Sequence, residues 1–305
     1  MELICEHAGG VAVGLFFFLS AFGIVRSYQK HGNKYLLKLI LVNVVKLYII
    51  SVLINLLIYF VYFNESLSTQ DALLRIFNLD VFNDFNRMNR HGWFISTIIG
   101  MYLIFALVYF LCSKLKTKNK FIIAGIILSL IAIGFRVGAI IADKGGMYTR
   151  ELPTFAIGII YATFYPQINA FLKKYFWPSL IISFIGFWVG FFTLEFISTY
   201  CAAIMIIVLS QKITYYSKTT YFLGKICLGV YLFLYFSTLT LQSFVTNPYW
   251  WMLLNAGFIL ELSVMLYAVQ IFINLTIKKI VERIKHRKNK NEENVDIITT
   301  NNLPL

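Results

Sequence analysis

The feature that most restricts the fold of this chain is the repetition of apolar segments long enough to cross a lipid bilayer. The hydrocarbon core is about 30 Å thick, so a spanning α-helix needs about 20 predominantly apolar residues. Runs of this kind follow one another along nearly all of the 305 residues. Only 13% of the residues are charged, which is too little polar surface to cover a large soluble helical domain. The sequence therefore predicts an all-α, polytopic transmembrane helical bundle.

The runs and the breaks between them predict about nine spans. Their approximate bounds are 9–25, 40–63, 93–112, 121–141, 152–172, 177–194, 196–210, 221–245 and 250–277. The seventh is short for a spanning helix. Residues 64–92 are too polar to cross, and their stretch LLRIFNLDVF predicts an interfacial helix or a re-entrant segment. We expect residues 1–277 to form one transmembrane domain and residues 278–305 to form a basic, partly disordered tail.

Charges in the connections alternate in sign along the chain. Basic residues follow the odd-numbered spans, as at Lys38, Lys114, Lys173 and Lys212, and the tail reads KKIVERIKHRKNK. Acidic residues dominate the other connections, as at Asp80, Asp143 and Glu195. By the positive-inside rule, the odd-numbered connections and the C-terminus are cytoplasmic. The net charge of +13 is then explained by basic residues that set the orientation in the membrane, with some attraction to anionic lipid, and it requires no nucleic-acid partner.

This orientation places the first residues, MELICEHAGG, outside the cytoplasm. One further helix upstream would give ten spans with both ends in the cytoplasm. The charge pattern therefore predicts that a first span is missing. The alternative is a protein whose N-terminus is genuinely outside.

Three polar residues near the start of the second span are candidates for binding a cytoplasmic ligand. Asn43 and Lys46 are three residues apart, which places them on one face of an α-helix, and Lys38 lies two turns before Lys46. Together they offer two cations and an amide to a phosphate-bearing ligand. The alternative is that both lysines extend to lipid headgroups.

Other polar residues suggest further sites. Glu261 lies roughly 16 Å into the last span, where it serves either as half of a structural ion pair or as a functional carboxylate. His91, in NRMNRHGWF before the third span, is a weak candidate for proton transfer, and a solvated loop histidine is the alternative. Arg150 and Glu151 open the fifth span and suggest a local ion pair. Neither the four cysteines nor the four histidines have metal-ligand spacing, so no metal site is predicted.

With these pieces placed, five stretches in order resemble the membrane acyltransferase 3 family. They are GGVAVGLFFFLSAFGIVR, VNVVKLY, WFISTIIGMY, RELPTFAIGIIYA and LGKICLGVYLFLY. The first is similar to the family's F-F-x-L-S-G-F run, with Ala21 at the last glycine. Asn43 and Lys46 occupy the positions of two arginines. Trp93 and Arg150 match the third and fourth motifs. The resemblance extends from about Gly9 to the last span.

The resemblance implies a ten-helix integral enzyme, an acyltransferase transferring groups other than aminoacyl groups. Such enzymes move an acyl group, usually acetyl, from cytoplasmic acetyl-CoA to a hydroxyl on an extracytoplasmic polysaccharide or glycan. The family's catalytic histidine lies on the helix before the F-F-x-L-S-G-F run, and no residue here matches it. His7 is too close to the run and is expected in a loop. The resemblance therefore predicts a truncated or degenerate enzyme that transfers acyl groups feebly or not at all, with no bound cofactor.

Two other classes of function stay open. Glu261, Arg136 and Lys46 can line the substrate path of a transporter or flippase-like protein. A non-catalytic partner in polysaccharide assembly is a third possibility. High Ile, Phe, Asn and Lys usage and the lack of a eukaryotic targeting signal suggest a bacterial inner membrane.

Overall fold

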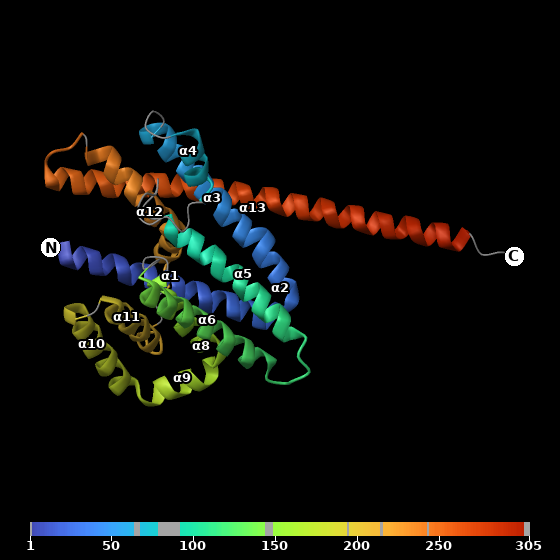
Figure 1. Ribbon diagram of the computed structural model, residues 1–305, viewed down its shortest axis with the longest axis horizontal. Helices are drawn as coiled ribbons and strands as arrows, with labels where there is room; N and C mark the ends of the chain where they lie inside the picture. Colours follow the sequence, from blue (N-terminus) through green and yellow to red (C-terminus); the bar gives the residue numbers. More distant parts are fainter. Residues whose placement is uncertain are drawn as a thin grey trace. The chain divides into compact units, whose positions relative to one another are not determined.

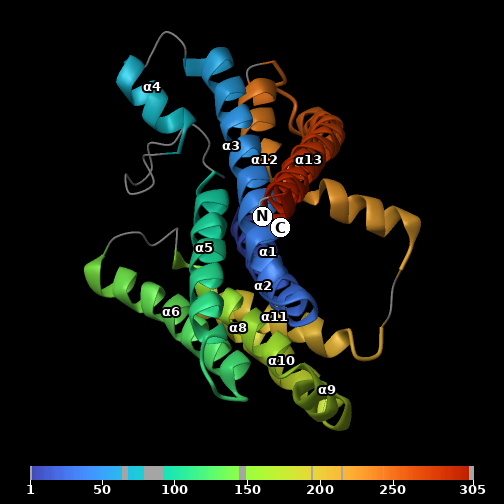
Figure 2. The same ribbon diagram turned by 90° about the vertical axis from the view of Figure 1, so that its right-hand side faces the viewer.

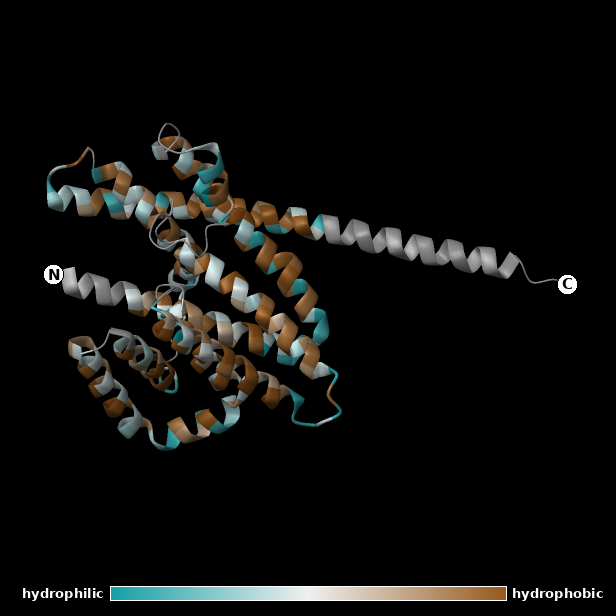
Figure 3. Cartoon of the chain, in the orientation of Figure 1, coloured by the Kyte–Doolittle hydropathy of each residue, from teal (hydrophilic) through white to brown (hydrophobic). Residues whose placement is uncertain are grey.

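Helices are the only regular elements in the described part of the computed structural model (Figure 1). The described residues are 2–63, 68–78, 92–143, 149–193, 195–213, 216–242 and 244–301. Seven helices among them are long and apolar enough to cross a membrane, or eight if a bent pair counts as one span. A shorter apolar helix covers Ile197–Leu209. The predicted all-α polytopic bundle is thus confirmed, and Figure 3 shows hydrophobic residues along these helices.

The chain divides into two compact units, Met1–Tyr221 and Phe222–Leu305. The helices of the first unit are α1 (Glu2–His31), α2 (Asn33–Lys38), the π-helical η1 (Leu39–Val44), α3 (Val45–Ile58), the π-helical η2 (Tyr59–Phe63), α4 (Thr69–Ile76), α5 (Trp93–Ser113), α6 (Lys120–Ala142), α8 (Leu152–Thr163), α9 (Tyr165–Lys174), α10 (Phe176–Thr193) and α11 (Glu195–Leu209). Most of α12 (Lys218–Gln242) and all of α13 (Pro248–Asn301) form the second unit.

We had expected the fifth span to be one straight helix, but the structure shows two helices with a bend between them. α8 and α9 are bent by 93° at the break around Phe164. Pro166 lies in the first turn of α9, where its missing N–H group costs nothing, but it cannot continue the hydrogen bonding of α8. Across the bend, the Tyr161 hydroxyl donates to Asn169 Oδ1 at 2.8 Å. Prediction from hydropathy missed the bend because α8 and α9 together are long and apolar enough to pass as one span.

Two helices extend beyond the predicted spans. α1 begins at Glu2, so His7 lies in a helix and not in the expected loop. Residues 2–9 contain no proline, and half of them are good helix formers, so the helix can extend through them. α13 continues to Asn301, so most of the tail that we expected to be partly disordered is helical.

The end of α4 is hydrogen-bonded to residues in the middle and last turns of α3. Asn55 Nδ2 donates to the carbonyl of Ile76 at 3.2 Å and to Asn78 Oδ1 at 3.0 Å, and Asn78 Nδ2 donates to Ser51 Oγ at 2.9 Å. Asn55 is seven residues before Tyr62, or about 10 Å along the helix. The end of α4 therefore lies well below the end of that span, which favours the re-entrant over the interfacial prediction.

The core of the first unit is built around α1, which packs against α8 and α11, while α8 also packs against α6 (Figures 1 and 2). The contact between α1 and α8 depends on small residues. A Cβ added to Gly158 would lie 2.5 Å from the carbonyl oxygen of Phe18 and 2.9 Å from Cβ of Ala21. Phe17, Ala21 and Phe155 are completely buried beside it. The two helices are thus as close as their backbones allow.

Gly158→Ala is expected to destabilise the protein by about 1–3 kcal/mol, because the obstructing carbonyl belongs to a helix backbone that cannot easily move. Gly134→Ala on α6 is the matched control, since nothing lies within 4 Å of its added Cβ. It should be neutral or slightly stabilising, because alanine is the better helix former. Thermal unfolding of the purified proteins measures both. Equal melting temperatures for the two variants would contradict the close α1–α8 contact.

Candidate active site

Arg150 and Glu151, at the start of α8, form the ion pair that the sequence suggested. Arg150 Nε lies 2.8 Å from Glu151 Oε1. The Glu151 side chain is only 1% exposed, whereas that of Arg150 is 31% exposed. Among the described residues, Glu151 is the only charged residue that is fully buried. One partner is therefore part of the core, and the other reaches the surface.

Three helices enclose this pair. On α8, the Thr154 hydroxyl donates to the Glu151 carbonyl at 2.5 Å. On α11, the Tyr200 hydroxyl donates to the Arg150 carbonyl at 3.1 Å. On α1, a Cβ added to Gly14 would lie 3.0 Å from Glu151 Oε2 and would also collide with the Thr199 side chain, so only glycine lets α1 come this close. We call Gly14, Arg150, Glu151, Thr154 and Tyr200 the ion-pair cluster.

The ion-pair cluster has the chemistry of a site that orients a polar substrate. A carboxylate removed from water is costly unless it is paired, so Glu151 fixes the guanidinium next to it. The guanidinium of Arg150 has a fixed, planar geometry that suits a hydroxyl, a carboxylate or a developing oxyanion. The positive-inside rule predicts that this end of α8 lies on the outer side of the membrane. Arg150 is thus suited to an extracytoplasmic ligand.

A basic pocket lies at the opposite end of α1. It has a volume of about 620 Å³ and is lined by Arg26, Ser27, Gln29, Lys30 and His31. Arg26 Nη1 donates to Gln29 Oε1 at 2.7 Å, and its guanidinium carbon lies 4.8 Å from the centre of the Tyr165 ring. Two cations beside an aromatic ring suit a phosphate-bearing ligand.

The two sites lie along the same pair of helices. Gly14 of the ion-pair cluster and Arg26 of the basic pocket are twelve residues apart on α1, or about 18 Å along its axis. On the partner helix, Glu151 immediately precedes α8 and Tyr165 begins α9, directly after it. One end of this pair thus carries the buried carboxylate, and the other end carries the cations.

The three predicted donor-binding residues flank or occupy a π-helical segment. Lys38 ends α2 and is exposed, Asn43 is half-buried in η1, and the half-buried Lys46 is the second residue of α3. Because π-helical turns contain about one more residue than α-helical turns, the spacing argument that placed Asn43 and Lys46 on one face does not apply across η1. Short π-helical segments are frequent at functional sites, which keeps this region of interest.

The remaining predicted site residues have different surroundings. Trp93 begins α5 and is 5% exposed, with its ring stacked on Phe17 at a centroid distance of 6.3 Å, so it packs in the core. Glu261 is exposed on α13 and forms no ion pair with any described residue. His91 lies outside the described residues, and its predicted role stays a prediction. Among the residues that the structure describes, no group of three or more metal-ligating side chains is found.

Sequence reasoning missed several members of these sites. Arg26 and Lys30 were interpreted only as orientation charges, although the aromatic residues around Tyr165 were a further signal. Gly14 and Tyr200 had no local signal at all, because their importance arises from contacts with α8, far away in the sequence.

A family model described as an acyltransferase domain, acyltransferase 3, matches residues 7–275. No curated protein and no solved structure matches the chain.

Proposed function

This chain belongs to the acyltransferase 3 family of membrane acyltransferases, and we propose that it moves an acetyl group from acetyl-CoA to an extracytoplasmic polysaccharide or glycan. In this reaction the thioester C–S bond breaks and an ester C–O bond forms. The acceptor hydroxyl loses its proton to a base, and coenzyme A leaves as the thiol. We propose the bacterial inner membrane as its location.

One observation carries this proposal: α1 and α8 together hold a polar site at each end. Acyl transfer across a membrane requires a donor site on the cytoplasmic side and an acceptor site on the other side. The basic pocket and the ion-pair cluster have the charges that a donor site and an acceptor site need, and they lie about 18 Å apart along α1. A simple transporter would not need a buried carboxylate fixing a partly exposed arginine at one end only.

We assign roles to residues on this basis. Arg26 and Lys30 of the basic pocket, with Lys46 and its neighbours Lys38 and Asn43, bind the phosphates of the donor. Arg150 orients the acceptor, and Glu151 is a positioning residue for Arg150. His91 remains the predicted base.

The direct test uses the purified chain in sealed vesicles, with radiolabelled acetyl-CoA on one side and a glycan acceptor on the other. We expect slow transfer of label to the glycan, because general acid–base help is worth about 10²–10⁴ in rate and His91 is only a weak candidate for the base. One equivalent of free thiol should appear for each ester formed. Loss of transfer in His91→Ala would identify the base.

Other outcomes would contradict the proposal. Movement of unmodified glycan across the membrane, with no ester and no thiol, would favour the transporter alternative. Neither movement nor ester formation, with intact binding to an assembly partner, would favour a non-catalytic role.

A further inference from the structure

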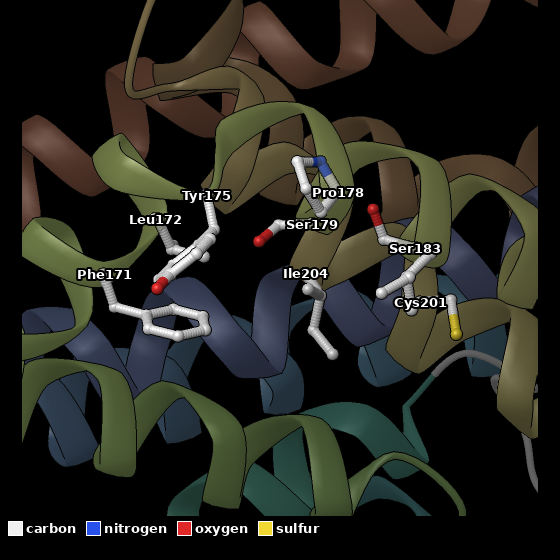
Figure 4. Close-up of a pocket in the computed structure, with 9 residues that line it drawn as sticks. Phe171, Leu172, Tyr175, Pro178, Ser179, Ser183, Cys201 and Ile204 are labelled. Atoms are coloured by element: carbon white, nitrogen blue, oxygen red, sulfur yellow. The ribbon is translucent and has the colours of Figure 1, made fainter.

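An apolar groove lies between α9, α10 and α11, apart from both sites described above. Its volume is about 460 Å³. Figure 4 shows Phe171 and Tyr175 at one end, Ser183 and Cys201 at the other, and Ser179 and Ile204 between them. Ser183 adds little polarity to it, since its Oγ donates to the Leu180 carbonyl at 3.0 Å. Almost all of its accessible wall is hydrocarbon.

The groove results from the bend that follows α8. The 93° turn carries α9 sideways, and α10 then returns along α11. α10 and α11 are in close contact, because a Cβ added to Gly186 would lie 2.6 Å from Cys201 Sγ. The sideways α9 does not fill the space beside this tight pair. A hollow therefore remains below α9, along one side of α10 and α11.

The groove covers the depth of one bilayer leaflet. From Ser183 on α10 to Tyr175, just before α10, both of which line the groove, is eight residues, or about 12 Å. One leaflet contributes about 15 Å of hydrocarbon. Tyr175, at the other end of the groove, lies at the junction of α9 and α10, on the side that the loop charges assign to the cytoplasm. The length and depth of the groove match an acyl chain of the inner leaflet.

Two cations stand at the cytoplasmic end. Lys174 Nζ lies 5.1 Å from the ring centre of Tyr175, which lines the groove. Lys212 Nζ lies 4.2 Å from the ring centre of Phe176 and 5.1 Å from that of Trp177. Both lysines are exposed, and tryptophan at this level is typical of the headgroup region. The charges thus complement an anionic headgroup above an apolar chain.

We propose that this groove is a binding site for an anionic phospholipid of the inner leaflet. One acyl chain lies between α9, α10 and α11, and the phosphate contacts Lys174 and Lys212. This lipid site does not depend on acyl transfer, so it can be tested separately from the proposed function.

The test is native mass spectrometry of the purified protein titrated with phosphatidylglycerol or with phosphatidylcholine carrying the same chains. Wild-type protein should bind phosphatidylglycerol about tenfold more tightly or better, since each lysine near an anionic lipid contributes about fivefold. Lys174→Gln/Lys212→Gln should lose this preference and retain weak binding of both lipids. Lys116→Gln/Lys118→Gln, which removes two exposed lysines of another connection, should not change the preference.

The groove itself is tested by a matched pair on α11. Ile204 lines the groove and is 38% exposed, whereas Ile206 is 40% exposed and does not line it. Ile204→Trp should remove binding of both lipids at this site, and Ile206→Trp should bind as wild type does. Wild-type affinity in Ile204→Trp, or equal affinity of the wild-type protein for the two lipids, would overturn the proposal. If Ile204→Trp does not fold, the lysine variants decide the question.

Discussion

Arg150→Met is expected to destabilise the protein by about 3–5 kcal/mol, the cost of removing one partner from a buried ion pair. Glu151 is almost completely enclosed by α1, α8 and α11, so its carboxylate would lose its guanidinium partner in a largely buried position. Acyl transfer should fall to the level of protein-free vesicles, because losing one oriented electrostatic donor costs about 10²–10³ in rate. Thermal unfolding and the vesicle assay measure the two effects.

A second variant separates stability from function. Arg150→Met/Glu151→Leu removes both charges and keeps similar volumes, so it should recover most of the lost stability. It should not recover acyl transfer. Arg75→Met on α4 is the control for loss of a guanidinium at a half-buried position, and it should change neither property. Transfer at the wild-type rate in the double variant would show that the pair has only a structural role.

Removing a cation from the donor side is expected to weaken binding of acetyl-CoA. A charge-assisted contact to phosphate is worth about 1.5–3 kcal/mol, which is roughly 10- to 150-fold in affinity. Lys46→Ala should approach the upper value because Lys46 is half-buried, and Arg26→Ala should lie near the lower value because Arg26 is exposed. Isothermal titration of the purified variants measures these affinities.

The control and the ligand analogue make this test specific. Lys116→Ala removes an exposed lysine from another connection and should leave the affinity unchanged. Dephospho-coenzyme A has one phosphate fewer. Substituting a residue that contacts that phosphate should therefore reduce the affinity for dephospho-coenzyme A less than it reduces the affinity for acetyl-CoA. Unchanged acetyl-CoA binding in both Lys46→Ala and Arg26→Ala would remove both residues from the donor site.

The helices were predictable from sequence because few backbone structures are stable in the hydrocarbon of a bilayer. Backbone groups in hydrocarbon must be paired within the segment, so each apolar run of sufficient length becomes a helix. The predicted spans 93–112 and 121–141 agree with α5 and α6 to within one residue at each end. The prediction of one straight fifth span was wrong because α8 and α9 together are long and apolar enough to pass as one span, and only Pro166 marked the position of the bend.

Much less of the candidate site was predictable. Arg150 and Glu151 are adjacent in the chain, so their ion pair was suggested by sequence alone. The contacts that enclose them join residues far apart, such as Gly14, Glu151 and Tyr200, and no single sequence reveals such pairs. The π-helical η1 changes which helix face Asn43 and Lys46 occupy relative to each other. This was not predictable, because composition does not distinguish a π-helical turn from an ordinary α-helical one.

The backbone contact between Gly158 and Phe18 has a consequence for how a group can be passed between the two faces of the protein. Helices in such close contact cannot slide or rotate against each other without a collision. α1 and α8 therefore move as one rigid unit, so the separation between Arg150, just before α8, and Arg26, on α1, stays constant during turnover. In the proposed reaction, the distance must be covered by the long flexible arm of coenzyme A and by helices other than this pair.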